Sequence, residues 1–128
     1  MDSTLSARIL IIEDEILTVK SIAKSLVHFG YQVAGFATNY SDGIAMVIEL
    51  KPDLVLMDVK LSSDKDGIDL AKRIQAEYNI PIVFLSAHSD VKTINRVFET
   101  KPDGYLVKPY ADQELYNTIR IAINRQRP

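Results

Sequence analysis

The sequence contains no cysteine, which excludes disulfides, thiolate metal sites and catalysis by a thiol. It also lacks long apolar runs: the longest are four to six residues, whereas a membrane-spanning helix needs about 20. Residues 1–8 have neither the basic start nor the apolar stretch of a signal peptide. We therefore expect a cytoplasmic protein without a membrane segment.

Net charge is also low, at −2, so the charge balance does not point to a nucleic-acid or acidic-membrane surface. Hydrophobic residues make up 47% of the chain and charged residues 25%, close to globular averages, which predicts a buried core. A length of 128 residues fits one domain. We expect a single domain over residues 1–128, with a core of about residues 8–123 and loose ends at residues 1–7 and 124–128.

Five short apolar runs recur along the chain, and we interpret them as β-strands. Four of the runs are continuous rather than alternating, as in strands that are buried on both faces of a parallel sheet. The remaining run, Gln32–Ala37, is more mixed and fits an edge strand. The predicted strands are Ile9–Ile12, Gln32–Ala37, Leu54–Met57, Ile82–Leu85 and Tyr105–Val107.

After each of these runs, apolar residues recur at the spacing of an amphipathic helix. Capping residues precede four of the five predicted helices, namely Ser41-Asp42, Asp66, Ser89-Asp90 and Asp112. The second and fourth helices are expected to end at Lys51-Pro52 and Lys101-Pro102, because a proline cannot continue a helix.

Five alternating strand–helix units predict an α/β fold: an open five-stranded parallel sheet with helices on both faces, wound right-handed. A closed barrel of eight such units would need about twice this length. In an open sheet of this kind the functional crevice lies at the carboxyl ends of the strands. The residues that follow each strand are therefore the candidates for a site.

Chemically active side chains follow four of the five predicted strands. Glu13-Asp14-Glu15 follows the first strand, Asp58 the third, Ser86 the fourth and Lys108-Pro109 the fifth. Clustered carboxylates repel one another, and a hard cation such as Mg²⁺ relieves that repulsion while leaving positions for waters and phosphate oxygens. A hydroxyl and an ammonium beside them complete a site suited to phosphoryl transfer onto an aspartate.

Taken together, these residues resemble the receiver domains of two-component response regulators. The resemblance rests on the acidic pair Glu13-Asp14, on Asp58, on Ser86 and on Lys108-Pro109, each at a strand end and in the family's order. It covers about residues 8–123. It implies the flavodoxin-like strand order 2-1-3-4-5, which the periodicity does not establish.

The resemblance also implies a role for each residue. Asp58 is expected to accept a phosphoryl group, and Ser86 and Lys108 to grip it. Mg²⁺ is expected to be held by Glu13, Asp14, Asp58 and the backbone carbonyl of Lys60. Tyr105 matches the family's aromatic switch position, and Lys108-Pro109 its cis peptide bond. The chain departs from the family in having Glu13 where aspartate is commoner, and one extra residue in the loop before Asp66-Gly67.

The implied partners are a sensor histidine kinase or phosphotransfer protein as donor and an unknown output domain or effector, with homodimerisation common in the family. The protein is then a phosphoacceptor and not an enzyme. The main alternative is a pseudo-receiver, a constitutive interaction module with the same fold. A flavodoxin-like electron carrier needs a phosphate-binding loop where this chain has Glu13-Asp14-Glu15. An aspartate-dependent phosphatase usually has a second acid where this chain has Lys60.

Overall fold

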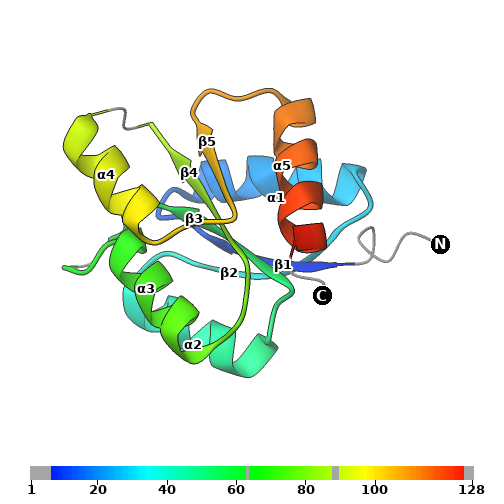
Figure 1. Ribbon diagram of the computed structural model, residues 1–128. Helices are drawn as coiled ribbons and strands as arrows, with labels where there is room; N and C mark the ends of the chain where they lie inside the picture. The colour runs from blue at the N-terminus through cyan, green and yellow to red at the C-terminus, as the bar shows by residue number, and fades with distance from the viewer. Residues whose placement is uncertain (1–6, 63, 88–89, 126–128) are drawn as a thin grey trace.

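In a computed structural model of the protein, which describes residues 7–62, 64–87 and 90–125, strands and helices alternate from Arg8 to Arg125 (Figure 1). The order is β1 (Arg8–Ile12), α1 (Ile16–His28), β2 (Gln32–Ala37), α2 (Tyr40–Leu50), β3 (Leu54–Asp58), α3 (Gly67–Glu77), β4 (Ile82–Ser86), α4 (Val91–Glu99), β5 (Gly104–Val107) and α5 (Asp112–Arg125). All strand pairs are parallel, in the order β2-β1-β3-β4-β5. The predicted fold class and strand order are confirmed.

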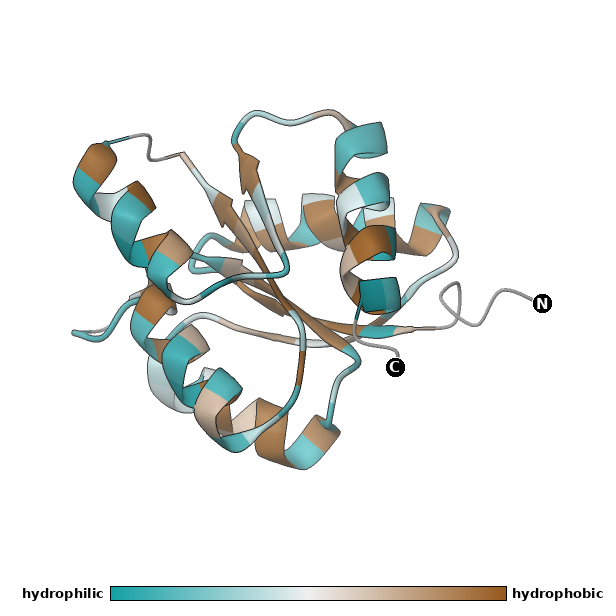
Figure 2. Ribbon diagram, viewed as in Figure 1, coloured by the Kyte–Doolittle hydropathy of each residue, from teal (hydrophilic) through white to brown (hydrophobic). Residues whose placement is uncertain are grey.

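The sheet is covered on both faces, which explains why its central strands are continuously apolar. Alternate residues of a strand point to opposite faces. On β1, Ile9 and Ile11 pack into the layer under α1 and α5, whereas Leu10 and Ile12 pack into the layer under α2, α3 and α4. Figure 2 shows the same arrangement as mostly brown central strands between helices in which teal and brown segments alternate. The mixed strand β2 lies at an edge, as predicted.

Side-chain caps fix where three of the helices begin. Asp66 and Asp90 cap α3 and α4, as expected, by accepting hydrogen bonds from the backbone N–H groups of Asp69 and Thr93. The predicted start of α2 at Ser41-Asp42 is wrong, because the Asn39 side chain accepts a 2.8 Å bond from the Asp42 N–H and the helix begins at Tyr40. Ser89 lies outside the described residues.

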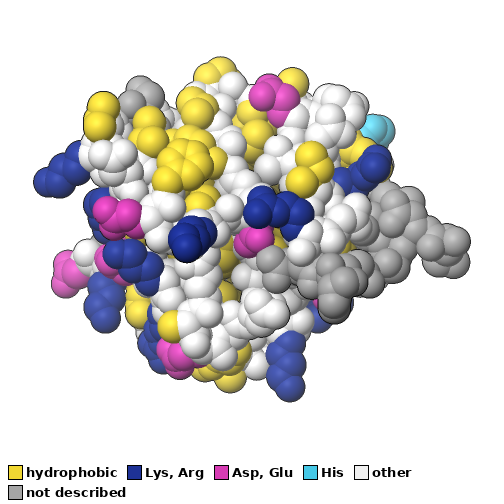
Figure 3. Space-filling view, in the orientation of Figure 1, with side chains coloured by type: hydrophobic (Ala, Val, Ile, Leu, Met, Phe, Trp, Pro, Cys, Tyr) yellow, Lys and Arg dark blue, Asp and Glu magenta, His cyan; other side chains and the backbone are white. Residues whose placement is uncertain are grey.

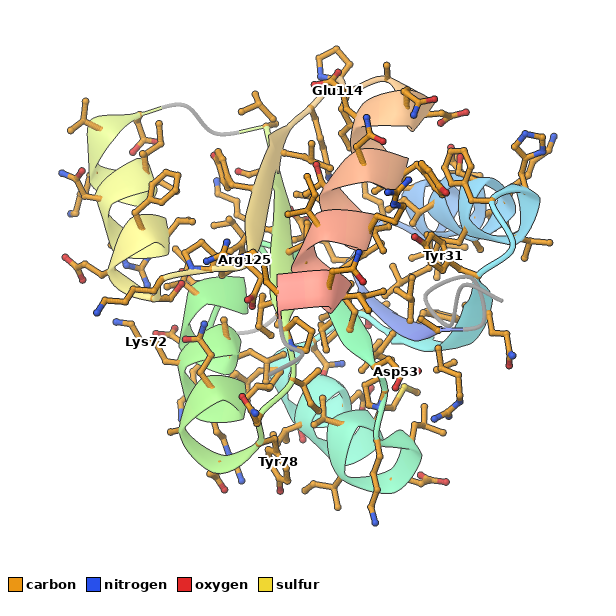
Figure 4. All side chains as sticks on the ribbon, turned by 45° about the vertical axis from the view of Figure 1, so that its right-hand side comes forward. Tyr31, Asp53, Lys72, Tyr78, Glu114 and Arg125 are labelled. Carbon is orange, nitrogen blue, oxygen red and sulfur yellow. The ribbon has the colours of Figure 1, made fainter. Side chains whose placement is uncertain are left out.

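The two Lys-Pro-Asp segments, residues 51–53 and 101–103, make equivalent hydrogen bonds at the end of the sheet where the strands begin. Lys51 and Lys101 both adopt the left-handed conformation, with φ of 47° and 52°. The Asp53 N–H donates a 2.8 Å hydrogen bond to the Arg8 carbonyl, and the Asp53 carboxylate accepts a 2.8 Å hydrogen bond from the Arg8 N–H, which ties the start of β3 to the start of β1. Asp103 pairs with Ile82 in the same way, at 2.9 Å each. Figure 4 labels Asp53 at this end of the sheet and Glu114 near the other.

The ends of the folded core extend slightly beyond the prediction. Ala7 is buried, and its carbonyl oxygen accepts a 2.9 Å hydrogen bond from the Gln32 N–H. Helix α5 continues to Arg125 rather than stopping at residue 123. The expectation of loose ends is therefore wrong for residues 7, 124 and 125. Within the described part of the chain, no helix is long and apolar enough to cross a membrane.

Truncating a central strand residue tests this packing. Leu56 on β3 is fully buried, so Leu56→Ala should lower the free energy of unfolding by about 2–5 kcal/mol, through lost apolar burial and a residual cavity. Urea denaturation measures the change. Leu17→Ala is the matched control, since Leu17 is 80% exposed and its truncation should cost less than about 0.5 kcal/mol. Equal losses in the two variants would contradict the burial pattern.

Candidate functional site

Three carboxylates meet at the carboxyl ends of the adjacent strands β1 and β3. Asp58 is the last residue of β3, and Glu13 and Asp14 directly follow β1. One oxygen from each of the three side chains lies within 4.8 Å of the others. Glu13 is 1% exposed and Asp58 9%, while Asp14 is half-buried and opens the cluster toward solvent. The fold thus brings together the acids that the sequence analysis singled out.

Lys108 brings the balancing positive charge from the end of β5. Its Nζ lies 2.8 Å from Glu13 Oε1 and 3.8 Å from Asp58 Oδ1. Its backbone N–H donates a 2.8 Å hydrogen bond to the Ser86 carbonyl, and the following bond to Pro109 is cis, as expected. In the described structure Lys108 is therefore bonded to Glu13 and only approaches Asp58.

The electrostatics of the cluster differ from one acid to the next. Burial, followed by the hydrogen bond with Glu13, raises the pKa of Asp58 from 3.8 to about 7, although Lys108 opposes the shift. Burial disfavours ionised Glu13, but the hydrogen bonds with Lys108, Asp58 and Asp14 and the charge of Lys108 together outweigh it, and the pKa of Glu13 is lowered. Glu13 and Lys108 are consequently an ion pair at neutral pH, whereas Asp58 still binds a proton part of the time.

The cluster is suited to a metal ion. Oxygen donors from carboxylates are the ligands that hard divalent cations prefer. Burial and the neighbouring Glu13 also raise the pKa of Asp14, so the cluster gains by binding a cation that favours the ionised forms. Glu13, Asp14 and Asp58 could therefore hold a metal. The Lys60 side chain is exposed two residues beyond Asp58, and the role of its carbonyl stays a prediction.

Ser86 and Tyr105 lie on the neighbouring strands. Ser86 is fully buried at the end of β4, and β4 pairs with β3 so that Leu85 is level with Asp58. Tyr105 is half-buried on β5, level with Phe84 of β4. Its ring packs against that of Phe98 on α4, with ring centroids 5.6 Å apart. The roles of both residues remain predictions.

Two supporting features were missed by the sequence analysis. A Cβ atom on Gly67 would lie 1.9 Å from the Asp58 carbonyl oxygen, so only glycine lets α3 begin against the main chain of Asp58. The Gly67 N–H also donates a 2.7 Å bond to the Val59 carbonyl. The backbone carbonyl of Thr38, directly after β2, accepts a 3.2 Å hydrogen bond from the Ser62 N–H of the long loop after β3.

Comparison with known proteins gives a family match over most of the chain. Residues 9–120 match the family model described as the response regulator receiver domain. The chain is 36% identical over 126 residues to the transcriptional regulatory protein PdtaR of Mycobacterium tuberculosis, covering 98% of this chain and 61% of that protein. It is 31% identical over 122 residues to the DNA-binding response regulator MtrA of Mycolicibacterium smegmatis, covering 95% and 53%. The chain thus spans about half to three-fifths of these relatives.

A solved structure agrees with this match. The signal receiver domain of a modulated diguanylate cyclase from Desulfovibrio desulfuricans G20 superposes with a TM-score of 0.89 at 34% identity, covering 94% of this chain and 96% of that one.

The raised pKa of Asp58 predicts a pH-dependent stability. Between pH 4 and 7 the folded protein binds this proton more tightly than the unfolded chain does, so the Asp58 contribution makes the protein less stable as pH rises through that window. Asp58→Asn removes the effect. Without added metal, this variant should be more stable than wild type by roughly 1–3 kcal/mol at pH 8 and about equal at pH 4.

Urea denaturation at the two pH values checks this. Asp64→Asn, which makes the same charge change at an exposed position of the loop after β3, should show no such difference between pH 4 and pH 8. A gain for Asp58→Asn that is the same at both pH values would contradict the raised pKa.

Proposed function

Because this chain belongs to the response-regulator receiver family, whose members are regulatory phosphoacceptor modules rather than enzymes, we propose that it is a signalling switch that is phosphorylated on Asp58. The donor is a histidine kinase or phosphotransfer protein, and the reaction depends on Mg²⁺. The single observation that carries this proposal is the carboxylate cluster with the Lys108 ammonium 3.8 Å from Asp58.

The nucleophile is a carboxylate oxygen of Asp58. It attacks the phosphorus atom of the donor, the new bond from Asp58 oxygen to phosphorus forms, and the bond between phosphorus and the donor breaks with its electron pair leaving on the donor. Only the ionised form of Asp58 attacks, which is why a group that lowers its pKa promotes the reaction. Lys108 is close enough to turn from Glu13 to the incoming phosphoryl oxygens.

Mg²⁺ would be held by Glu13, Asp14, Asp58 and the Lys60 carbonyl. When bound, the ion neutralises charge on the carboxylates and on the phosphoryl oxygens. The Ser86 hydroxyl donates a hydrogen bond to a phosphoryl oxygen once the phosphoryl group is attached to Asp58. These assignments are supported by the positions of Glu13, Asp14, Asp58 and Ser86 at, or directly after, the carboxyl ends of β1, β3 and β4.

The readout surface is the face formed by α4, β5 and α5. A phosphoryl group adds about −1.5 to −2 units of charge, which draws Ser86 and Lys108 inward and lets the Tyr105 ring change its packing. Val91, Phe98 and Val107 are 74%, 52% and 48% exposed on α4 and β5. Figure 3 shows hydrophobic side chains gathered over this region, at the upper left. An exposed apolar surface of this kind suits an output partner or a second copy of the chain.

The receiver segment does not itself bind DNA in this proposal, in keeping with its net charge of −2. PdtaR is described as a transcriptional regulator and MtrA as DNA-binding, and both are longer than this chain. The output of the present protein is therefore left to whichever partner or domain reads the α4–β5–α5 face. A pseudo-receiver, which binds that partner without phosphorylation, is the competing proposal.

Incubation with acetyl phosphate and Mg²⁺ tests the proposal. Wild-type protein should gain the mass of one phosphoryl group in an intact-mass spectrum, because the small donor supplies the same leaving-group chemistry as a kinase. EDTA should prevent the gain, since the carboxylates then lack their cation.

Asp58→Asn should gain nothing, and Asp64→Asn, the exposed control, should behave as wild type. Folded wild-type protein that stays unmodified with every phosphodonor tried would overturn the switch and favour the pseudo-receiver.

A further inference from the structure

Helix α4 is the least firmly embedded helix of the structure. Its one buried residue within the described chain is Val97, whereas each other helix buries at least three residues. In Figure 1 it stands at the edge of its layer, at the upper left. Since little apolar area holds α4 in place, its position depends strongly on the few polar contacts that it makes with neighbouring elements.

The strongest of these contacts joins α4 to α3 through Arg96. Its Nη1 lies 2.9 Å from Asp66 Oδ2, and its Nη2 lies 3.4 Å from Asp66 Oδ1. Nη2 is also 3.7 Å from Asp69 Oδ1. A guanidinium that binds both oxygens of one carboxylate fixes orientation as well as distance.

Asp66 in turn lies at the start of α3, which packs against the main chain of Asp58. It caps α3 through a reciprocal pair of bonds with Asp69, each 3.0 Å long. The next residue, Gly67, lies against the Asp58 carbonyl so closely that a Cβ there would be 1.9 Å from the oxygen. Arg96 is thus linked to the main chain of Asp58, the proposed phosphoacceptor, through Asp66 and its neighbour Gly67.

A phosphoryl group on Asp58 would act on the two sides of this contact differently. Ser86 ends β4, and α4 begins at Val91, so α4 is the first helix after Ser86 and is the helix that a movement of Ser86 toward the phosphoryl group would displace. Asp66 remains fixed to α3, which buries five residues in the core. Displacement of α4 relative to α3 would therefore lengthen the contact between Arg96 and Asp66.

We propose that Arg96 is a positioning residue that latches α4 to the Asp66 cap in the unphosphorylated protein, so that phosphorylation of Asp58 and release of Arg96 are coupled. The coupling rests on the proposed function. Linkage makes it reciprocal: weakening the latch makes the phosphorylated arrangement easier to reach and so raises the affinity of the site for a phosphoryl group.

Hydrogen exchange of α4, with beryllofluoride and Mg²⁺ as a non-covalent phosphoryl analogue, tests this coupling. Because ion pairs that are partly exposed are weak, Arg96→Met should speed exchange of the α4 amides in the unliganded protein by roughly two- to fivefold. The same variant should bind beryllofluoride roughly two- to fivefold more tightly. Asp66→Asn should do likewise, since asparagine keeps the cap and loses the charge.

The matched control is Lys92→Met. Lys92 is exposed on the same helix, one turn before Arg96, and forms no ion pair within the part of the chain that the structure describes. It should leave both the exchange and the beryllofluoride affinity unchanged.

The outcomes separate this inference from the proposed function. If wild type responds to beryllofluoride, and Arg96→Met and Asp66→Asn match it in exchange and affinity, the latch is overturned and the switch stands. If wild type does not respond to beryllofluoride while acetyl phosphate also fails to modify it, the proposed function fails and the coupling with it.

Discussion

Three carboxylates held within 4.8 Å of one another at the end of β1 and β3 form the constraint around which the rest of the site is arranged. Two of them are almost fully buried, where like charges repel strongly. The 2.8 Å bond between Lys108 and Glu13 neutralises one charge, and partial protonation of Asp58 relieves another. The carboxylates that remain could be balanced by a divalent cation, for which they offer oxygen ligands.

The topology explains how this constraint arises. The order β2-β1-β3-β4-β5 places the ends of β1 and β3 side by side, and Lys108 reaches the cluster from β5. The two helices that follow β3 and β4 are held in place by different contacts. Helix α3 begins against the main chain of Asp58 through Gly67, whereas α4 is held by Val97, by the Phe98–Tyr105 ring contact and by Arg96. Helix α3, which buries five residues, therefore begins against Asp58, whereas α4 buries one.

Local pattern in the sequence predicts the strands, the helices and the strand-end acids, because each depends on residues close in the chain. Continuous apolar runs identify β1, β3 and β4, and Asp66 and Asp90 are caps as expected. The start of α2 was misplaced because Asn39, not Ser41-Asp42, provides the cap. The contact of Arg96 with Asp66 spans 30 residues, and the need for glycine at position 67 comes from a carbonyl nine residues away. Neither has a periodic signal, so both required the structure.

The central claim is that the Asp58 carboxylate itself carries the phosphoryl group. Borohydride reduction of the acetyl-phosphate-treated protein, followed by peptide sequencing in a mass spectrometer, tests it most directly, because an acyl phosphate is reduced to an alcohol while a free carboxylate is not. We expect Asp58 to be converted to homoserine and Glu13 and Asp14 to stay unchanged. Reduction at another acid, or at none in protein that has gained phosphoryl mass, would contradict it.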